Sequence, residues 1–202
     1  MSQQPKVFFV TTNDSKVVTP ARVLARHGIS VERVDLETVE IQAASVAEVV
    51  AHKARAAFRA INAPVLVNDG SILIDALNGF PGPYVKHVNR MIRIQGYLDL
   101  MARYPEGQRG ATVTDAVAYI DPSRPAPAVF IRSKRGTITT QARGTHVQGR
   151  MTLSPIFIPE GYDKTYAEMT EEEYDAYRTT TENEKVYEDV AKAILGTQTT
   201  FE

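Results

Sequence analysis

Short apolar runs and helical stripes of apolar residues alternate along this chain. Val7–Thr11 is short and apolar with β-branched residues, a pattern typical of a buried strand. Ser45-x-x-Glu48 forms a capping box, which predicts a helix that continues to about Ala60. By the same criteria we predict further helices over Pro20–His27, His87–Tyr104 and from Thr181 to about Leu195. We predict further strands over Ser30–Leu36, Val65–Val67, Ile72–Leu77, Thr112–Ile120, Ala128–Arg132 and Gly136–Gln141.

The order of these elements favours one fold class. Strands and helices alternate in the first half of the chain, which predicts an α/β arrangement. The strands between residues 112 and 141 predict an additional antiparallel part. A chain of 202 residues suits one domain, or one domain with two lobes. We therefore expect a single mixed-sheet α/β domain over residues 1–202, with helices flanking the sheet.

Composition and charge argue against several classes of partner. The 23 lysines and arginines nearly balance the 24 aspartates and glutamates, so the net charge is −1. A protein that binds duplex nucleic acid needs a surplus of basic residues. No apolar run approaches the roughly 20 residues that a membrane span requires. The chain lacks cysteine, and its N-terminus lacks a signal-peptide pattern. We expect a cytoplasmic protein that binds neither duplex nucleic acid nor a membrane.

The stretch Val65–Lys86 carries the strongest candidate chemistry. Its apolar beginning ends abruptly at Asn68 and Asp69, and the end of a buried strand is where open α/β sheets bind ligands. An aspartate at such a place can bind Mg²⁺ or activate water. The stiff Gly/Pro-rich loop Asn78–Pro83 then leads to Lys86. The pattern also permits a plain strand–turn–strand with a hairpin turn that begins at Asp69.

Weaker candidates lie outside this stretch. The segment Thr11-x-Asn13-x-x-Lys16 follows the first predicted strand, and a hydroxyl, an amide and a lysine there can hold phosphate oxygens. The same residue types also form ordinary turns. Glu40 and Lys53 have no local feature that distinguishes them from solvent-facing surface residues.

Three segments of this chain together resemble the inosine-triphosphate pyrophosphatase family, whose members remove deaminated purine nucleotides. The segments are Thr11–Lys16, Val65–Lys86 and Pro155–Met169, and they occur in the family's order at about the family's spacing. The resemblance implies a two-lobed α/β fold with flanking helices, an active-site cleft between the lobes and, commonly, a homodimer. It also implies hydrolysis of a nucleotide substrate, a nucleoside triphosphate, to monophosphate and pyrophosphate with Mg²⁺ as cofactor, or with Mn²⁺ as an alternative metal.

The resemblance also implies roles for individual residues. Asp69 matches the acid that holds the metal and activates the attacking water, and Glu40 matches the outer metal carboxylate. Asn68 stands where the family usually has a second acid, so it offers the metal a carbonyl oxygen but no charge. The residues expected to contact the triphosphate are Thr11, Asn13, Lys16, Lys53 and Lys86.

The part of the family pattern that recognises the base differs in this chain. Met151–Ser154 stands where the family has an aromatic-Gly-aromatic-Asp run. Glu173–Asp175 and Arg178–Thr180 stand in place of the family's Glu-Lys-Asn and Ser-His-Arg signatures. Either the pocket has lost its selectivity, or it accepts a different base. For the second interpretation we expect a pocket lined by Met151, Ser154, Tyr174, Tyr177 and Arg178.

Two functions remain open from the sequence. The first is a Mg²⁺-dependent nucleoside-triphosphate pyrophosphatase whose base specificity differs from that for deaminated purines. The second is a non-catalytic nucleotide-binding or regulatory protein on the same fold, since a fold does not determine function. The missing second acid and the missing base signatures motivate this alternative, and the ordered motifs favour the first.

Overall fold

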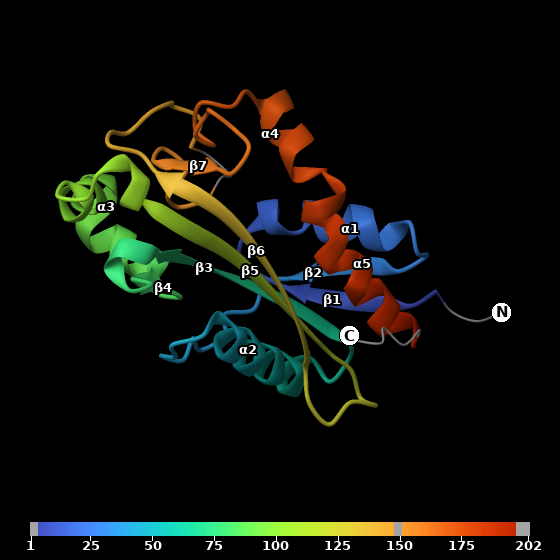
Figure 1. Cartoon of the computed structure of the whole chain (residues 1–202). Coiled ribbons are helices and arrows are strands. Elements are labelled where there is room, and N and C mark those ends of the chain that lie inside the picture. The colour runs from blue at the N-terminus through green and yellow to red at the C-terminus, as the bar shows by residue number, and fades with distance from the viewer. Residues whose placement is uncertain (1–3, 148–150, 197–202) are drawn as a thin grey trace.

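A computed structural model, which describes residues 4–147 and 151–196, arranges the chain around one mixed sheet (Figure 1). The seven strands follow the order β2-β1-β3-β5-β6-β7, and β4 pairs with β3. β1 pairs in parallel with β2 and β3, whereas the other pairs are antiparallel. The strands are β1 (Lys6–Val10), β2 (Ser30–Val34), β3 (Val65–Ile74), β4 (Pro81–Gly82), β5 (Gly110–Ile120), β6 (Ala128–Ile138) and β7 (Phe157–Pro159).

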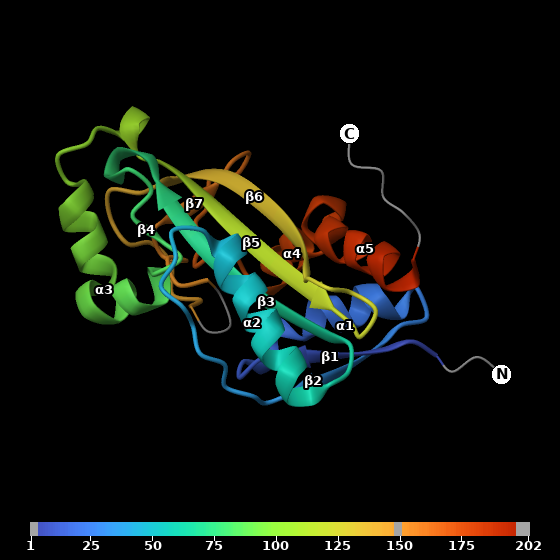
Figure 2. The same ribbon diagram turned by 90° about the horizontal axis from the view of Figure 1, so that it is seen from below.

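Helices cover both faces of this sheet. One helix, α2, lies across one face, and α1 and α5 lie side by side on the other (Figures 1 and 2). Among the described helices, none is long and apolar enough to cross a membrane. The helices are α1 (Val18–Ala25), α2 (Val46–Ile61), α3 (Val85–Met101), α4 (Glu171–Arg178) and α5 (Thr181–Leu195), with short 3-10 helices η1 (Asp14–Lys16), η2 (Asp75–Leu77) and η3 (Glu106–Gln108).

Strand alternation assigns the side chains of β3 and β5 to the two faces of the sheet. Leu66 and Val117 belong to the apolar cluster under α1 and α5. Their neighbours Val67 and Ala116 belong to the cluster under α2. Even-numbered residues of β3 and odd-numbered residues of β5 therefore point toward the face that α1 and α5 cover.

A polar seam separates two apolar cores on the α1 and α5 face. Ile72 of β3 and Ala111 of β5 lie on this face by alternation, but they join a different cluster with residues of α3, α4 and β7. Between the two clusters the same alternation places Asn68 and Gly70 of β3 and Asp115 of β5. These three residues are termed the polar seam below. The seam therefore lies between two apolar cores.

Two predicted interruptions between strands are wrong. Val65–Val67 and Ile72–Leu77 belong largely to the single strand β3, because β3 pairs with β5 along its whole length. Asp69 lies inside this ladder, so the alternative hairpin turn is also wrong. Likewise, Ala128–Arg132 and the beginning of Gly136–Gln141 lie in the single strand β6. The apolar pattern stops at polar and glycine residues, whereas a long antiparallel ladder continues through them.

The helices differ from the prediction in three places. α1 begins at Val18, so Pro20 is its third residue and lies in the first turn, where no intrahelical partner for its missing N–H is lost. α3 contains a break at Arg93 (φ 55°, ψ −174°), where two shorter helices meet. α4 was not predicted because almost all of its residues are polar; Thr170 and Glu173 form its capping box.

Glu168 joins the loop before β7 to the segment before α4. Its carboxylate accepts hydrogen bonds from Arg143 Nε (3.0 Å) and from the Thr165 N–H (2.8 Å). Burial acts to raise the pKa of the Glu168 carboxyl, but these hydrogen bonds outweigh burial and lower the pKa. Because the pKa is lower in the folded state, the stabilisation is complete above the unfolded pKa of roughly 4.3 and is lost as the pH falls through the folded pKa.

We expect Glu168→Gln to lower the free energy of unfolding by about 1 kcal/mol at neutral pH. The difference in melting temperature between wild type and variant should shrink below about pH 4, since the wild-type carboxylate is then protonated as well. Thermal unfolding followed from about pH 3 to pH 7 measures this difference. A difference that stays constant over the whole range would show that the charge of Glu168 does not contribute.

Candidate functional site

Near its middle, β3 has an open edge. On one side it pairs with β1 only at Val65 and Leu66, and with β4 only at Ile72 and Leu73. In the described part of the chain no strand pairs with residues 67–71 on this side. This edge is termed the β3 gap. It interrupts the sheet between the end of β1 and the beginning of β4.

Backbone groups of β3 point into the β3 gap. The C=O of Pro64 accepts a hydrogen bond from the Phe8 N–H of β1 (2.9 Å), which places the even-numbered residues toward this side. The N–H of Gly70 accordingly donates to the carboxylate of its neighbour Asp69 (2.8 Å) instead of to a strand. The same alternation turns the backbone of Asn68 into the gap. A polar ligand at the gap would therefore meet backbone donors and acceptors.

Lys53 joins the two candidate metal carboxylates. Its Nζ atom, on α2, lies 3.0 Å from Asp69 Oδ2 and 3.0 Å from Glu40 Oε1. The two oxygens are therefore at most 6.0 Å apart, twice the length of either contact. The Lys53 side chain is only 15% exposed, so it points inward rather than into solvent. Three segments that are distant in the sequence thus place opposite charges in direct contact.

The charges in this group stabilise one another. Burial acts to lower the pKa of Lys53, but the Coulomb attraction of Asp69 and hydrogen bonds to Asp69 and Glu40 outweigh burial and raise it. Burial acts to raise the pKa of Glu40, but its hydrogen bond to Lys53 and the charges of Lys53 and Lys86 outweigh burial and lower it. Lys53 is therefore protonated and Glu40 ionised at neutral pH.

Two further lysines bring positive charge that no described carboxylate contacts. Lys16 ends η1, Lys86 lies in the first turn of α3, and neither forms an ion pair with a described residue. Burial lowers the pKa of Lys16, against the attraction of Asp69 and Asp115. The charge of Lys86 lies close enough to lower it further. A bound anion would relieve the repulsion between these ammonium groups.

Thr11 and Asn13 shape the loop that carries Lys16. Asn13 Oδ1 accepts hydrogen bonds from the Ser15 N–H (3.0 Å) and the Ser15 hydroxyl (2.8 Å), and so caps η1. Thr11 Oγ1 accepts from the Asn13 N–H (3.1 Å), and its own hydrogen stays available for an acceptor. The predicted triphosphate contacts Thr11, Asn13 and Lys16 therefore share one short loop that directly follows β1.

Asn68 does not join the acids. Strand alternation turns its side chain to the face opposite Asp69, away from Lys53. There it lies beside the Tyr187 hydroxyl. Its Oδ1 atom is buried without a hydrogen-bond partner. The structure therefore separates Asn68 from the other two predicted metal ligands.

Three of the predicted base contacts lie together on α4. The rings of Tyr174 and Tyr177 stack, with centroids 6.3 Å apart and planes inclined by 16°. The Tyr177 hydroxyl lies 2.6 Å from that of Tyr166. The Arg178 guanidinium lies 5.6 Å from the centre of the Tyr174 ring. These residues form an aromatic cluster, and their contact with a base stays a prediction.

The other two predicted base contacts lie just before β7. The Ser154 N–H donates to the Met151 C=O (3.0 Å), and the Ser154 C=O accepts from the Ala167 N–H (3.1 Å). Met151 packs against the apolar cluster that contains Tyr177, and Ser154 is 1% exposed. Met151 therefore adjoins the same apolar core as the tyrosines of α4, and a contact between Ser154 and a base stays a prediction.

Two residues near this group were not predicted. His87 Nε2 lies 3.6 Å from Glu40 Oε2. Asp115 lies close enough to Lys16 to affect its pKa, and its carboxylate lies over Gly70. The sequence contains a signal for Asp115, because it is an acid inside a predicted apolar strand. His87 directly follows Lys86, a predicted phosphate contact, and this adjacency is the signal for it.

The donor set of Glu40 and Asp69 fits a hard cation. Mg²⁺ takes one or two protein carboxylates and completes its octahedral shell with water and phosphate oxygens. The two carboxylates already flank one positive group, Lys53 Nζ. Among residues 4–147 and 151–196, no group of three or more His, Cys, Asp or Glu side chains could hold a metal. Substrate phosphates and water would have to supply the other ligands.

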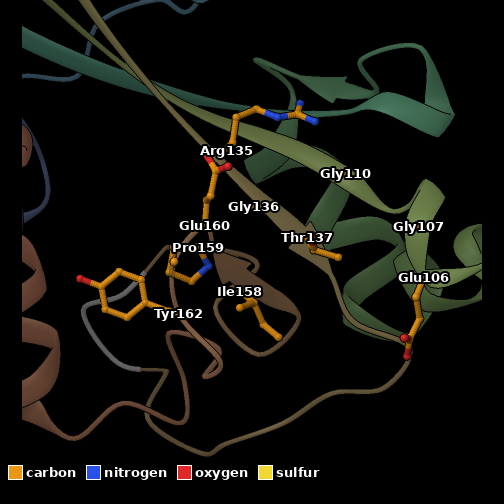
Figure 3. A pocket seen from close by; sticks show the side chains of 11 residues that line it. Glu106, Gly107, Gly110, Arg135, Gly136, Thr137, Ile158, Pro159, Glu160 and Tyr162 are labelled. Carbon is orange, nitrogen blue, oxygen red and sulfur yellow. The ribbon is translucent and has the colours of Figure 1, made fainter.

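A separate cavity of about 440 Å³ lies at the outer end of β5, β6 and β7 (Figure 3). None of the predicted site residues lines it. The guanidinium of Arg135, at its rim, donates two hydrogen bonds to Asp75 (2.7 and 3.0 Å) and is thereby already paired. The candidate site is therefore the group around Lys53 and not this cavity.

Comparison with known proteins gives a consistent result. The model of the Ham1 family matches residues 7–181. A dITP/XTP pyrophosphatase from Methanopyrus kandleri is 42% identical over 168 residues, which cover 83% of this chain and 86% of that protein. Another from Pyrococcus horikoshii is 37% identical over 171 residues, or 85% and 88% of the two chains.

Solved structures agree on the fold. A HAM1 protein from Coxiella burnetii superposes with a TM-score of 0.78 over 95% of this chain and 99% of that chain, at 22% identity. This likeness supports the seven-stranded mixed sheet, whereas the family match and the more similar relatives support common descent. The chain therefore belongs to the Ham1 family.

Proposed function

We propose that the chain hydrolyses a nucleoside triphosphate to the monophosphate and pyrophosphate at the group around Lys53. The observation that supports this most directly is the contact of Lys53 with both Glu40 and Asp69, beside the unpaired ammonium groups of Lys16 and Lys86. A triphosphate is an anion that suits three lysines. Relatives from M. kandleri and P. horikoshii bear the name dITP/XTP pyrophosphatase.

Asp69 acts as the general base in this proposal. It takes a proton from water while the water oxygen forms a bond to the α-phosphorus. The bond from that phosphorus to the oxygen that bridges to the β-phosphorus breaks, and pyrophosphate leaves with this oxygen. Lys16, Lys53 and Lys86 neutralise the charge that develops on the phosphate oxygens. The contact with Lys53 also holds Asp69 in place.

Glu40 and Asp69 are the residues that would hold Mg²⁺, or Mn²⁺, together with the substrate. When bound, the metal supplies positive charge that neutralises the phosphate oxygens. Asn68 is left out of this set because its side chain lies on the other face of the sheet, beside Tyr187. The proposed metal position therefore has two carboxylates, those of Glu40 and Asp69, and the amide of Asn68 does not contribute to it.

The base specificity is proposed to differ from that for deaminated purines. Supporting this, Tyr174 stands within the segment that replaces the family's Glu-Lys-Asn signature, and it stacks on Tyr177. Leu153 and Ser154, which replace part of the aromatic-Gly-aromatic-Asp run, are buried. The side chains available to contact a base therefore differ chemically from those of the family pattern.

A panel of canonical, deaminated and modified ribo- and deoxyribonucleoside triphosphates tests this function. We expect equal amounts of monophosphate and pyrophosphate, identified by mass, from a preferred substrate whose base is neither hypoxanthine nor xanthine. Stepwise release of single phosphates would contradict the reaction. Binding without turnover in excess Mg²⁺ or Mn²⁺ would indicate the non-catalytic alternative. Preference for a deaminated purine would contradict only the altered specificity.

A further inference from the structure

Asp115 is the one exposed residue of β5, and it belongs to the polar seam between the two apolar cores. Its Oδ1 atom lies 3.8 Å from the position that a Cβ atom on Gly70 would occupy. Gly70 directly follows Asp69, the proposed general base. With strands about 4.8 Å apart and a rise of about 3.4 Å per residue, the Cα atoms of Asp115 and Asp69 are roughly 6 Å apart, but their side chains point to opposite faces of the sheet. Lys16 lies near enough to both carboxylates for each to affect its pKa, so a ligand held by Lys16 has Asp115 within a nucleoside's length.

The protein does not neutralise Asp115 by direct contact. Its cross-strand neighbour Arg132 donates to Asp189 of α5 instead (2.7 Å). Among the described residues, none donates a hydrogen bond to Asp115 or forms an ion pair with it. Lys16 lies near enough to attract it, but makes no ion pair with it. An exposed carboxylate thus lies in the seam with its acceptor oxygens unused.

Asp115 lies within electrostatic range of tyrosines from both apolar cores. Burial raises the pKa of Tyr187, which belongs to the core under α1 and α5, and the charge of Asp115 raises it further. Burial and the same charge also raise the pKa of Tyr166 and Tyr177, which belong to the other core. A ligand that extends from the lysines into the polar seam would therefore meet this carboxylate near the boundary of two cores that both contain tyrosines.

We propose that Asp115 is a specificity-determining residue that accepts hydrogen bonds from donor groups of the bound nucleoside. This inference rests on the proposed function, in which Lys16, Lys53 and Lys86 hold the phosphates and leave the nucleoside to reach the seam. An ionised carboxylate is an acceptor only, so it selects for donors. Sugar hydroxyls and N–H groups of the base are the two sources of such donors.

Calorimetric binding of α,β-methylene triphosphates, which cannot release pyrophosphate, tests this role on the full chain. One series varies the sugar: inosine, 2′-deoxyinosine and 2′,3′-dideoxyinosine. The other varies the donors of the base: inosine, guanosine and 1-methylinosine. For wild type we expect loss of the recognised donor to weaken binding by about tenfold or more. Asp115→Ala should reduce that ratio to within about twofold, and the series that responds identifies the donor.

The ratio between ligands is the decisive quantity, because removal of a negative charge near Lys16 shifts the affinity for every triphosphate together. Asp99→Asn, on the exposed side of α3, removes the same charge and should leave every ratio unchanged. If Asp115→Ala shifts the affinity for all ligands equally, so that the ratios stay unchanged in both series, the proposal is overturned. If the analogues bind in a donor-dependent way but the hydrolysable triphosphates yield no pyrophosphate, the proposed reaction is refuted and the role of Asp115 still stands.

Discussion

Asp69→Asn is expected to abolish pyrophosphate release, with kcat lower by about a thousandfold or more. An amide does not take up a proton from water at neutral pH, so the proposed general base is lost. The amide oxygen can take the place of Oδ1 and accept from the Gly70 N–H, while Lys53 Nζ keeps its contact with Glu40. The variant should therefore fold. Steady-state kinetics with the preferred nucleotide, together with circular dichroism and thermal unfolding, measure both effects.

Asp75→Asn is the matched control for this variant. Asp75 directly follows β3, and it pairs with Arg135 outside the group around Lys53. The same chemical change there should leave kcat within about twofold, since neither residue contacts the proposed site. A fully active Asp69→Asn protein would remove Asp69 from the mechanism. An equal loss in the Asp75→Asn protein would point to a general effect of charge.

Arg109→Met is expected to destabilise the folded protein strongly. The Arg109 side chain is 2% exposed, and burial lowers its pKa. Its guanidinium donates to four backbone carbonyls and so connects the end of α3 to the end of β6. The acceptors are the C=O groups of Met101 (2.6 Å), Tyr104 (3.1 Å), Ile138 (2.8 Å) and Thr139 (2.5 Å).

Methionine fills similar space but removes the guanidinium donors from these carbonyls, of which that of Met101 keeps a hydrogen bond from the Tyr104 N–H (3.0 Å). An unsatisfied buried polar group costs about 1–3 kcal/mol, so the loss should reach about 4 kcal/mol, or roughly 10 °C in melting temperature. Arg59→Met, at an exposed position of α2, is the control and should change stability by less than about 0.5 kcal/mol. Arg109→Lys keeps the charge with fewer donors, and its melting temperature should lie between those of Arg109→Met and Arg59→Met. A melting temperature of Arg109→Met close to wild type would contradict the role of the guanidinium.

Sequence-based prediction succeeded where the signal is local. Ser45 caps α2 as its pattern indicates, because a cap involves only the adjacent turn. Prediction failed where pairing with a distant segment decides the outcome. β3 continues through Asn68, Asp69 and Gly70 because β5 pairs with all of them, and no residue near Asn68 records that partner.

For the site, the family resemblance supplied the candidate acids and lysines, while their arrangement was not predictable. Glu40 and Lys53 carry no local feature that singles them out, yet they contact each other and Asp69. Asp115 was not among the predicted site residues, because the groups that surround it are set by the neighbouring strand and loop and not by the residues next to it in sequence. Long-range register decides these contacts.

The chain's hydrophobic periods and residue types establish, without coordinates, an α/β protein with ordered family motifs and a candidate base in Asp69. These are local properties of the polymer. The folded structure alone establishes that Lys53 bridges Glu40 and Asp69, that Asn68 turns away from them and that Asp115 lies exposed between two cores. The reason is strand geometry: one residue along a strand moves a side chain to the opposite face of the sheet, and only the register of neighbouring strands decides which side chains meet there.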